Sequence, residues 1–225
     1  QTKEHEPEPV STEVSSARNW YSAGGWPTLH QGPGNRDQAI GATIHSNYET
    51  WRALEGVALL VAPAVSPAKT RFYQTTGLSK GNSNLHAFSM DGEPLWQAPA
   101  WTDADNGVDP CAVLSNVIVD YRGDLYLGDC NQVFSFKPNG ELKWAAPLPA
   151  PQQEDWQPLP ELPINALTTP VFTSQGHLLG VTNFGDVVVW DRASGDVLSQ
   201  PMRLPGLLAP RSDVLKQPKT MWADG

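Results

Sequence analysis

The sequence lacks a long apolar run and has few charged residues. Its longest apolar stretch, Val57–Val65, has the length of a strand, whereas a membrane-spanning helix needs about 20 apolar residues. Charged residues make up 17% of the chain and the net charge is −9, which argues against nucleic-acid binding, because such binding needs a clustered basic face. The sequence therefore predicts neither a membrane span nor a nucleic-acid partner.

Cysteine is also scarce, with Cys111 and Cys130 as the two examples. They do not form a C-x-x-C pair, which argues against a thiolate metal site. In an exported protein an even number of cysteines favours a disulfide. The alternative is a pair of buried free thiols.

The terminal segments indicate export. The sequence opens at Gln1 without a methionine, as a processed or trimmed terminus would. Residues 1–18 are charged, contain proline and are rich in Ser and Thr, a composition typical of a disordered leader. We therefore expect a secreted or periplasmic protein.

Proline (21 residues) and glycine (19 residues) are abundant, which favours many turns and an all-β fold. Three segments, 62–97, 98–146 and 147–201, each contain four short β-rich runs, and their Gly92, Gly140 and Gly195 are spaced by 48 and 55 residues. Four short strands at this period are typical of a β-propeller blade.

An entry segment with a partial blade (19–61) precedes these blades, and 202–225 begins another blade or is a cleaved tail. Closed propellers usually have about four to eight blades, so we expect roughly half of a seven- or eight-bladed ring. A second chain or fragment should complete it. A cleaved precursor with proteolytic processing is favoured. The alternatives are a separately encoded half (a heterodimer), two copies of this chain, or a truncated sequence.

The repeats resemble PQQ-type, or quinoprotein-like, propeller repeats, such as those of quinoprotein alcohol dehydrogenases and the BamB-type outer-membrane assembly proteins. Their docking motif is A-x-D-x-x-x-G-x-x-x-W. Phe134–Trp144 keeps Gly140 and Trp144, and Val189–Ser199 keeps Asp191 and Gly195. The resemblance implies that indoles pack between blades beside tight glycine turns. The structural docking residues are Trp51, Trp96, Trp144, Gly140 and Gly195.

One face of such a propeller should carry the binding site. The connections 77–84, 97–114 and 145–167 are long and would share a face, while the connections of the opposite face are short. Long loops on a rigid scaffold commonly bind ligands. The alternative is that these loops are insertions without a function or that they bury the partner fragment. The candidate ligand-binding residues in them are Lys80, Asn82, Asn84, Trp101 and Trp156.

The second long connection also contains a candidate metal site. Asp103, Asp105 and Asp109 stand at positions 1, 3 and 7 of a short run, with Asn106 and Gly107 between the last two, and carboxylate oxygens at such spacing suit Ca²⁺. The motif lacks the final glutamate of an EF-hand, and the alternative is that these aspartates cap turns.

Two functions agree with these features. The first is an exported propeller subunit that binds a ligand or partner on the long-loop face. The alternative is a PQQ-type oxidoreductase, hydrolase or lyase with an axial active site shared between fragments. Quinoprotein dehydrogenases usually carry adjacent cysteines beside the cofactor, and this chain has no Cys-Cys pair, which argues against PQQ. The cofactor and the catalytic residues are not identified by the sequence.

Overall fold

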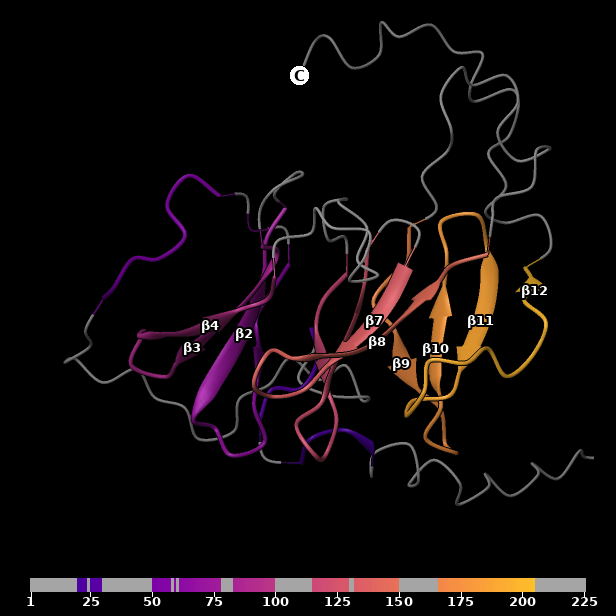
Figure 1. The fold of residues 1–225 in the computed structure, drawn as a ribbon, viewed down its shortest axis with the longest axis horizontal. Coiled ribbons are helices and arrows are strands. Elements are labelled where there is room, and N and C mark those ends of the chain that lie inside the picture. The colour runs from indigo at the N-terminus through magenta and orange to yellow at the C-terminus, as the bar shows by residue number, and fades with distance from the viewer. Residues whose placement is uncertain are drawn as a thin grey trace, which may run out of the picture.

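The computed structural model describes residues 20–23, 25–29, 50–57, 59, 61–77, 83–99, 115–129, 132–149 and 166–204. These residues form three four-stranded antiparallel sheets that stand side by side (Figure 1). The all-β prediction is confirmed. The strands are β1 (Ala64–Val65), β2 (Arg71–Thr75), β3 (Leu85–Ser89), β4 (Pro94–Gln97), β5 (Ile118–Val119), β6 (Leu125–Gly128), β7 (Gln132–Phe136), β8 (Leu142–Pro147), β9 (Val171–Phe172), β10 (Leu178–Val181), β11 (Asp186–Trp190) and β12 (Met202–Arg203).

Each sheet is a simple up-and-down unit. The strand orders are β1-β2-β3-β4, β5-β6-β7-β8 and β9-β10-β11-β12, so each sheet is one blade with its first strand innermost. In the first two blades the register shifts between the third and fourth strands, at Ala87/Phe88 and at Ser135/Phe136. Such a bulge increases the local twist of the outer strand.

The outer strand of the third blade extends beyond the predicted blade end at residue 201. Val197 makes an isolated bridge to Trp190, and β12 then pairs with Asp186 and Val187 of β11. Pro201 lies between the two pieces, and its missing N–H cannot contribute to a ladder. The fourth strand is therefore interrupted.

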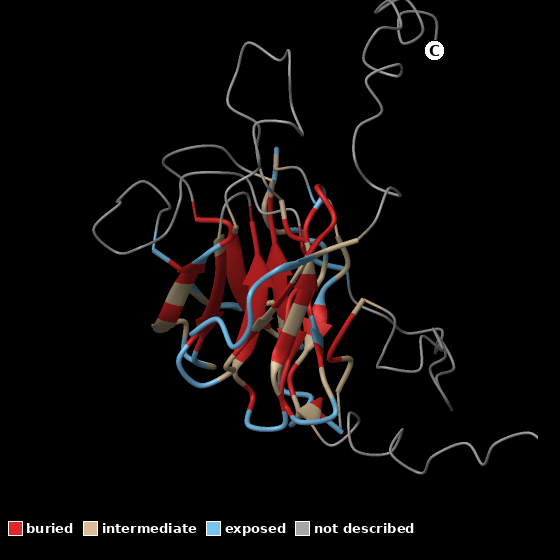
Figure 2. Cartoon of the chain, turned by 90° about the vertical axis from the view of Figure 1, so that its right-hand side faces the viewer, coloured by how far each residue is buried: buried red, intermediate tan, exposed pale blue. Residues whose placement is uncertain are grey.

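The core lies between the blades because side chains alternate across each sheet. Figure 2 shows the buried residues concentrated in the strands and the exposed ones in the turns. Leu125, Leu127 and Phe134 of the second blade face the first blade, whereas Tyr126 and Trp144 face the third. Both faces of the middle blade are thus apolar and buried, as a propeller requires.

A tryptophan and a glycine meet at each blade junction. The Trp96 indole of the first blade lies against Gly140 of the second, where an added Cβ would come within 2.7 Å of the ring. Its Nε1 donates to the Pro138 carbonyl at 3.0 Å. Gly140 has a φ of 88°, so the turn itself also requires glycine.

The next junction repeats this geometry. Trp144 of the second blade lies against Gly195 of the third, and its Nε1 donates to the Arg192 carbonyl at 3.1 Å. Before the first blade, Trp51 lies against Gly92 and stacks on Phe72 with ring centroids 5.6 Å apart. Trp51 therefore occupies the position that the outer strand of a preceding blade would fill.

The segment of residues 20–23 and 25–29, which we name the strap, crosses all three blades. It pairs with the free inner edges of the first two: Ser22 N–H donates to the Val119 carbonyl at 3.1 Å, and Val65 N–H donates to the Trp26 carbonyl at 2.7 Å. The strap, indigo in Figure 1, lies at the end of the sheets where the tight turns are found. It satisfies inner-strand backbone groups that would otherwise lack partners.

The junctions lead to a first prediction. Gly195 and Gly56 have similar φ values, 81° and 77°, but an added Cβ meets the Trp144 ring at 2.6 Å at Gly195 and nothing within 4 Å at Gly56. We expect Gly56→Ala to lower the free energy of unfolding by ~1 kcal/mol from strain alone. Gly195→Ala should cost about 2–4 kcal/mol because overpacking adds to the strain. Urea unfolding measures both.

A Trp144→Ala background tests whether the indole is the cause. Removing the ring should bring the cost of Gly195→Ala close to that of Gly56→Ala. An unchanged cost in that background would mean that the indole contact contributes nothing to the glycine requirement.

Candidate functional site

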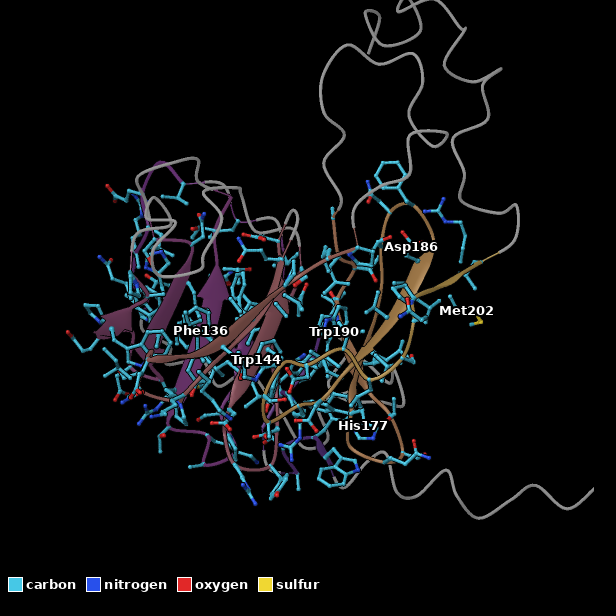
Figure 3. All side chains as sticks on the ribbon, turned by 45° about the vertical axis from the view of Figure 1, so that its right-hand side comes forward. Phe136, Trp144, His177, Asp186, Trp190 and Met202 are labelled. Carbon is cyan, nitrogen blue, oxygen red and sulfur yellow. The ribbon has the colours of Figure 1, made fainter. Side chains whose placement is uncertain are left out.

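The two ends of the blades differ in how their strands are connected. At one end the turns 66–70, 90–93, 120–124, 137–141 and 173–177 are short. The other end has the long connections 76–84, 98–117 and 148–170, together with the short connections 129–131 and 182–185. His177 and Asp186, at opposite ends of the third blade in Figure 3, mark these two faces. Binding residues are commonly placed on loops, so the face with the longer connections is the better candidate for a binding site.

Polar groups of all three blades, including a backbone carbonyl of the first, meet where the inner strands begin on this long-connection face. Asn116, which leads into β5, donates from Nδ2 to the Ala62 carbonyl at 2.9 Å, just before β1. The backbone N–H of Asn116 donates to Thr169 Oγ1 at 3.2 Å, just before β9. We call Ser115, Asn116 and Thr169 the axial cluster, because the innermost strands of a propeller surround its axis.

Asn116 donates two hydrogen bonds, but one of its side-chain atoms lacks a hydrogen-bond partner among the described residues. It is 1% exposed, and within the described part of the chain its Oδ1 has no hydrogen-bond partner. The neighbouring Ser115 Oγ is engaged, since it accepts from the Gly128 N–H at 2.6 Å. A buried acceptor without a donor costs free energy. The cluster can therefore accept a hydrogen bond from a group that this part of the chain does not supply.

The opposite end of the inner strands is closed by the strap and by a buried ion pair. Asp120, fully buried at the end of β5, pairs with Arg192 of the third blade. Burial raises the pKa of Asp120 although the Arg192 guanidinium and backbone N–H groups lower it. The Arg192 guanidinium also lies 5.0 Å from the centre of the Trp20 ring. These contacts join the strap, the second blade and the third blade.

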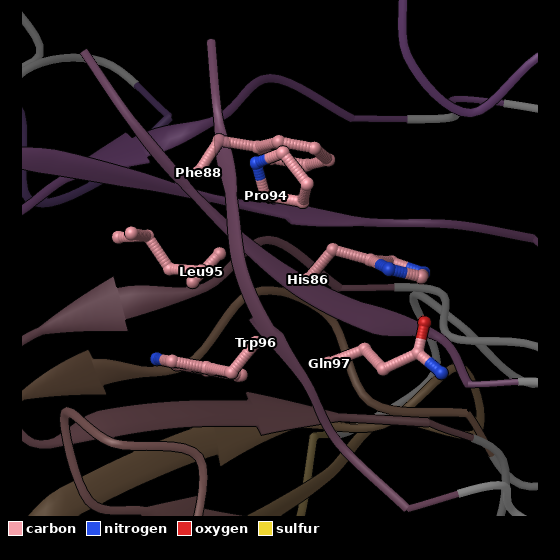
Figure 4. Close-up of a pocket in the computed structure, with 7 residues that line it drawn as sticks. His86, Phe88, Pro94, Leu95, Trp96 and Gln97 are labelled. Carbon is pink, nitrogen blue, oxygen red and sulfur yellow. The ribbon is translucent and has the colours of Figure 1, made fainter. Parts of the chain in front are cut away.

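The outward face of the first blade contains a hollow of about 240 Å³, shown in Figure 4. Its lining includes His86 and Gln97, which are register partners on β3 and β4, together with Phe88 and Pro94. His86 is buried, its Nε2 lies 3.1 Å from the Ser83 carbonyl, and burial lowers the pKa of its imidazole. This hollow lies beside Trp51, on the face where a preceding blade would pack.

The outward face of the third blade is aliphatic. Leu179 is in register with both Val171 and Val189, and Val181 with Val187. Val171 is 45% exposed and Met202 is 62% exposed, and Figure 3 shows Met202 at the outer edge of this blade. The equivalent faces of the first two blades are buried against the following blade. We name the surface formed by five of these residues the exit face: Val171, Leu179, Val181, Val187 and Val189.

Most of the residues proposed from sequence for ligand binding, metal binding and the disulfide lie outside the described residues. They are Lys80, Asn82, Trp101, Trp156, Asp103, Asp105, Asp109, Cys111 and Cys130. Asn84 is described: it is 1% exposed, and its Oδ1 accepts from Thr76 Oγ1 at 2.9 Å across the first long connection. Its ligand-binding role stays a prediction.

Sequence reasoning missed the axial cluster and the strap. Asn116 and Thr169 are common polar residues in stretches without a motif, and only the ring arrangement brings them together. The one sequence signal for the strap was the glycine at position 25. In the structure an added Cβ at Gly25 would come within 2.4 Å of the Val65 and Ser66 carbonyls. A glycine at such a close backbone approach is often indispensable.

The described residues also limit other kinds of site. In the ranges that the structure describes, no three His, Cys, Asp or Glu side chains are grouped as metal ligands would be. A search of the same ranges finds no helix with the length and apolar character needed to cross a membrane.

No protein-family model and no curated protein matches this chain. Its structure is similar to that of a quinohemoprotein alcohol dehydrogenase from Comamonas testosteroni, with a TM-score of 0.52 and 14% identity over 84% of this chain and 28% of the dehydrogenase. U3-55K (TM-score 0.48, 13% identity, 68% of this chain and 41% of that one) is also similar. The C-terminal WD40 domain of Sif2 is similar as well, with a TM-score of 0.35 and 12% identity over 69% of this chain and 49% of that one.

The chain thus spans less than half of the length of these proteins. At such low identity, the likeness to the dehydrogenase concerns the fold alone. Together with the three sheets and their junctions, it identifies the chain as a segment of a β-propeller.

His86 gives a second prediction. Because its folded-state pKa is lowered from 6.5, its neutral form is favoured by folding, and this contribution is lost as the pH falls below about 6.5 through the folded-state pKa. We expect the free energy of unfolding of the wild type to fall more steeply between about pH 7 and pH 5 than that of His86→Gln. Parallel slopes of the two proteins in urea unfolding would contradict this expectation.

Proposed function

We propose that this chain is part of a quinoprotein-like β-propeller that binds a polar ligand at the axial cluster, on the long-connection face. The observation that carries the proposal is the unsatisfied, buried Oδ1 of Asn116 where the three blades meet. The closed opposite end of the inner strands supports it, because the strap and the Asp120–Arg192 pair leave the long-connection face as the way in.

The chemistry of the cluster favours an uncharged ligand. Its side chains are an amide and two hydroxyls, and the available atom is an acceptor. A ligand with a hydroxyl or amide N–H could donate to Asn116 Oδ1, and burial would strengthen that bond. The cluster contains no side chain that could act as a general base for either hydroxyl, so the proposal is binding and not a reaction.

We further propose that a second chain or fragment completes the ring. The exit face of the third blade supports this, since equivalent faces of the other blades are covered. Ser199 stands four residues after Gly195, where Trp96 and Trp144 follow their glycines, so the next blade would be held by aliphatic packing instead of an indole. Apolar faces of this kind normally mark an interaction surface.

A thermal-shift screen of sugars, amino-acid amides and short peptides tests the axial site. We expect at least one compound to raise the Tm of the wild type, because binding to the folded state stabilises it. In Asn116→Ala, which removes both the acceptor and the bond to the Ala62 carbonyl, the basal stability should fall by about 1–2 kcal/mol. The ligand-induced shift, measured from the variant's own Tm, should disappear.

Asn139→Ala is the matched control, because Asn139 is exposed in a tight turn at the other end of the blade. It should keep the ligand-induced shift. The axial proposal fails if no compound stabilises the wild type, or if Asn116→Ala responds as the wild type does.

The composition of the isolated assembly tests the second part of the proposal. Native mass spectrometry should give a complex, and denaturing mass spectrometry should resolve it into this chain and a second polypeptide. Val189→Lys should dissociate the complex, because a lysine on the exit face would be buried without a partner. Met90→Lys, at a turn residue that is 49% exposed, should leave it intact. A single denatured species with the mass of a whole propeller would exclude a second chain.

A further inference from the structure

The tight-turn face contains a cleft between the first and second blades. It has a volume of about 230 Å³, and its lining includes Arg71, Tyr73, Tyr121, Arg122 and Pro138. The first blade contributes β2 and the turn before it, and the second contributes the turn after β5 and the turn after β7. The cleft is separate from the axial cluster, which lies at the other end of the inner strands.

The charge of this cleft is opposite in sign to the net charge of the chain. The protein carries a net charge of −9, yet the residues that line this cleft include two arginines and no aspartate or glutamate. Among the described residues neither Arg71 nor Arg122 forms an ion pair. Two aspartates of the turn that contributes Tyr121 and Arg122 are engaged elsewhere: Asp120 with Arg192, and Asp124 with Lys143 at 2.5 Å.

Both guanidinium groups are held in place by uncharged neighbours. Arg71 Nη1 donates to the Pro138 carbonyl at 3.2 Å, the same carbonyl that accepts from the Trp96 indole. The Arg122 guanidinium lies 5.2 Å from the centre of the Tyr121 ring. Stacking on an aromatic ring uses the face of a guanidinium and leaves its N–H edge available for an acceptor.

From this geometry we propose that the cleft is a binding site for a small oxyanion, a phosphate or carboxylate group, that bridges Arg71 and Arg122. Two like charges in one cleft repel each other, and an anion between them removes that repulsion while accepting charge-assisted hydrogen bonds from both. The arginine fork suits both planar carboxylates and tetrahedral phosphates. The volume is below that of a typical drug-sized pocket, about 300–1,000 Å³, which limits the occupant to a small ligand.

Thermal unfolding in inorganic phosphate or succinate, each compared with chloride at equal ionic strength, tests this site. At a concentration ten times its dissociation constant, the bound anion should raise the Tm by about 3–6 °C. A shift with phosphate alone identifies a phosphate ligand, and one with succinate alone identifies a carboxylate ligand. The absence of a shift with either anion overturns the proposal.

Three variants decide whether the shift arises in the cleft, because multivalent anions also stabilise proteins without binding a site. The double variant Arg71→Gln/Arg122→Gln should lose the shift. Arg122→Gln alone should reduce it, and since Arg122 is exposed this variant should fold normally. Arg52→Gln, which removes an exposed arginine outside the cleft, should keep the full shift. Equal shifts in all four proteins would show a general salt effect and overturn the proposal.

Discussion

The contact between an indole and a turn glycine is the constraint on which the rest of this structure depends. Trp96 on Gly140 and Trp144 on Gly195 set the distance and tilt between neighbouring blades. In each case the indole N–H also donates to a carbonyl of the same turn. The strap uses the same geometry in a different place: Trp20 lies against Gly176, and its Nε1 donates to the Ser174 carbonyl at 3.1 Å. One packing solution therefore joins blade to blade and strap to blade.

This constraint also positions both proposed binding sites. Because the junctions hold the blades at fixed angles, the starts of three inner strands meet at Asn116. At the other end of the first junction, Pro138 accepts from Trp96 and from Arg71, so the indole that docks the blades also helps to shape the arginine cleft. The two sites thus have opposite chemistries, a neutral acceptor on one face and paired cations on the other, on a single rigid frame.

The sequence predicted the architecture well because a blade is a local pattern. Turn glycines at regular spacing and alternating apolar residues, such as Phe134 and Phe136, are sufficient to predict four-stranded units and a propeller. The axial cluster could not be predicted, because Asn116 and Thr169 belong to different blades and neither stands in a motif. The strap was also missed as a structural element. Its backbone hydrogen bonds to Val119 and Val65 depend on which strand edges remain free, and that is decided only when the ring curves. Apart from Asn84, the loop residues proposed from sequence lie outside the described ranges, so the structure does not test their roles.

The strap has a consequence for the order in which the chain assembles. Trp20 bonds to Ser174, 154 residues later in the sequence, and the Phe172 N–H donates to the Tyr21 hydroxyl across 151 residues. Each blade can form from its own neighbouring strands soon after synthesis, but the strap has no complete binding surface until the third blade exists. The strap precedes all three blades in the sequence, yet it is the last of these elements whose contacts can be completed. Contacts of such long sequence separation are slow to form, so docking of the strap should follow formation of the individual blades.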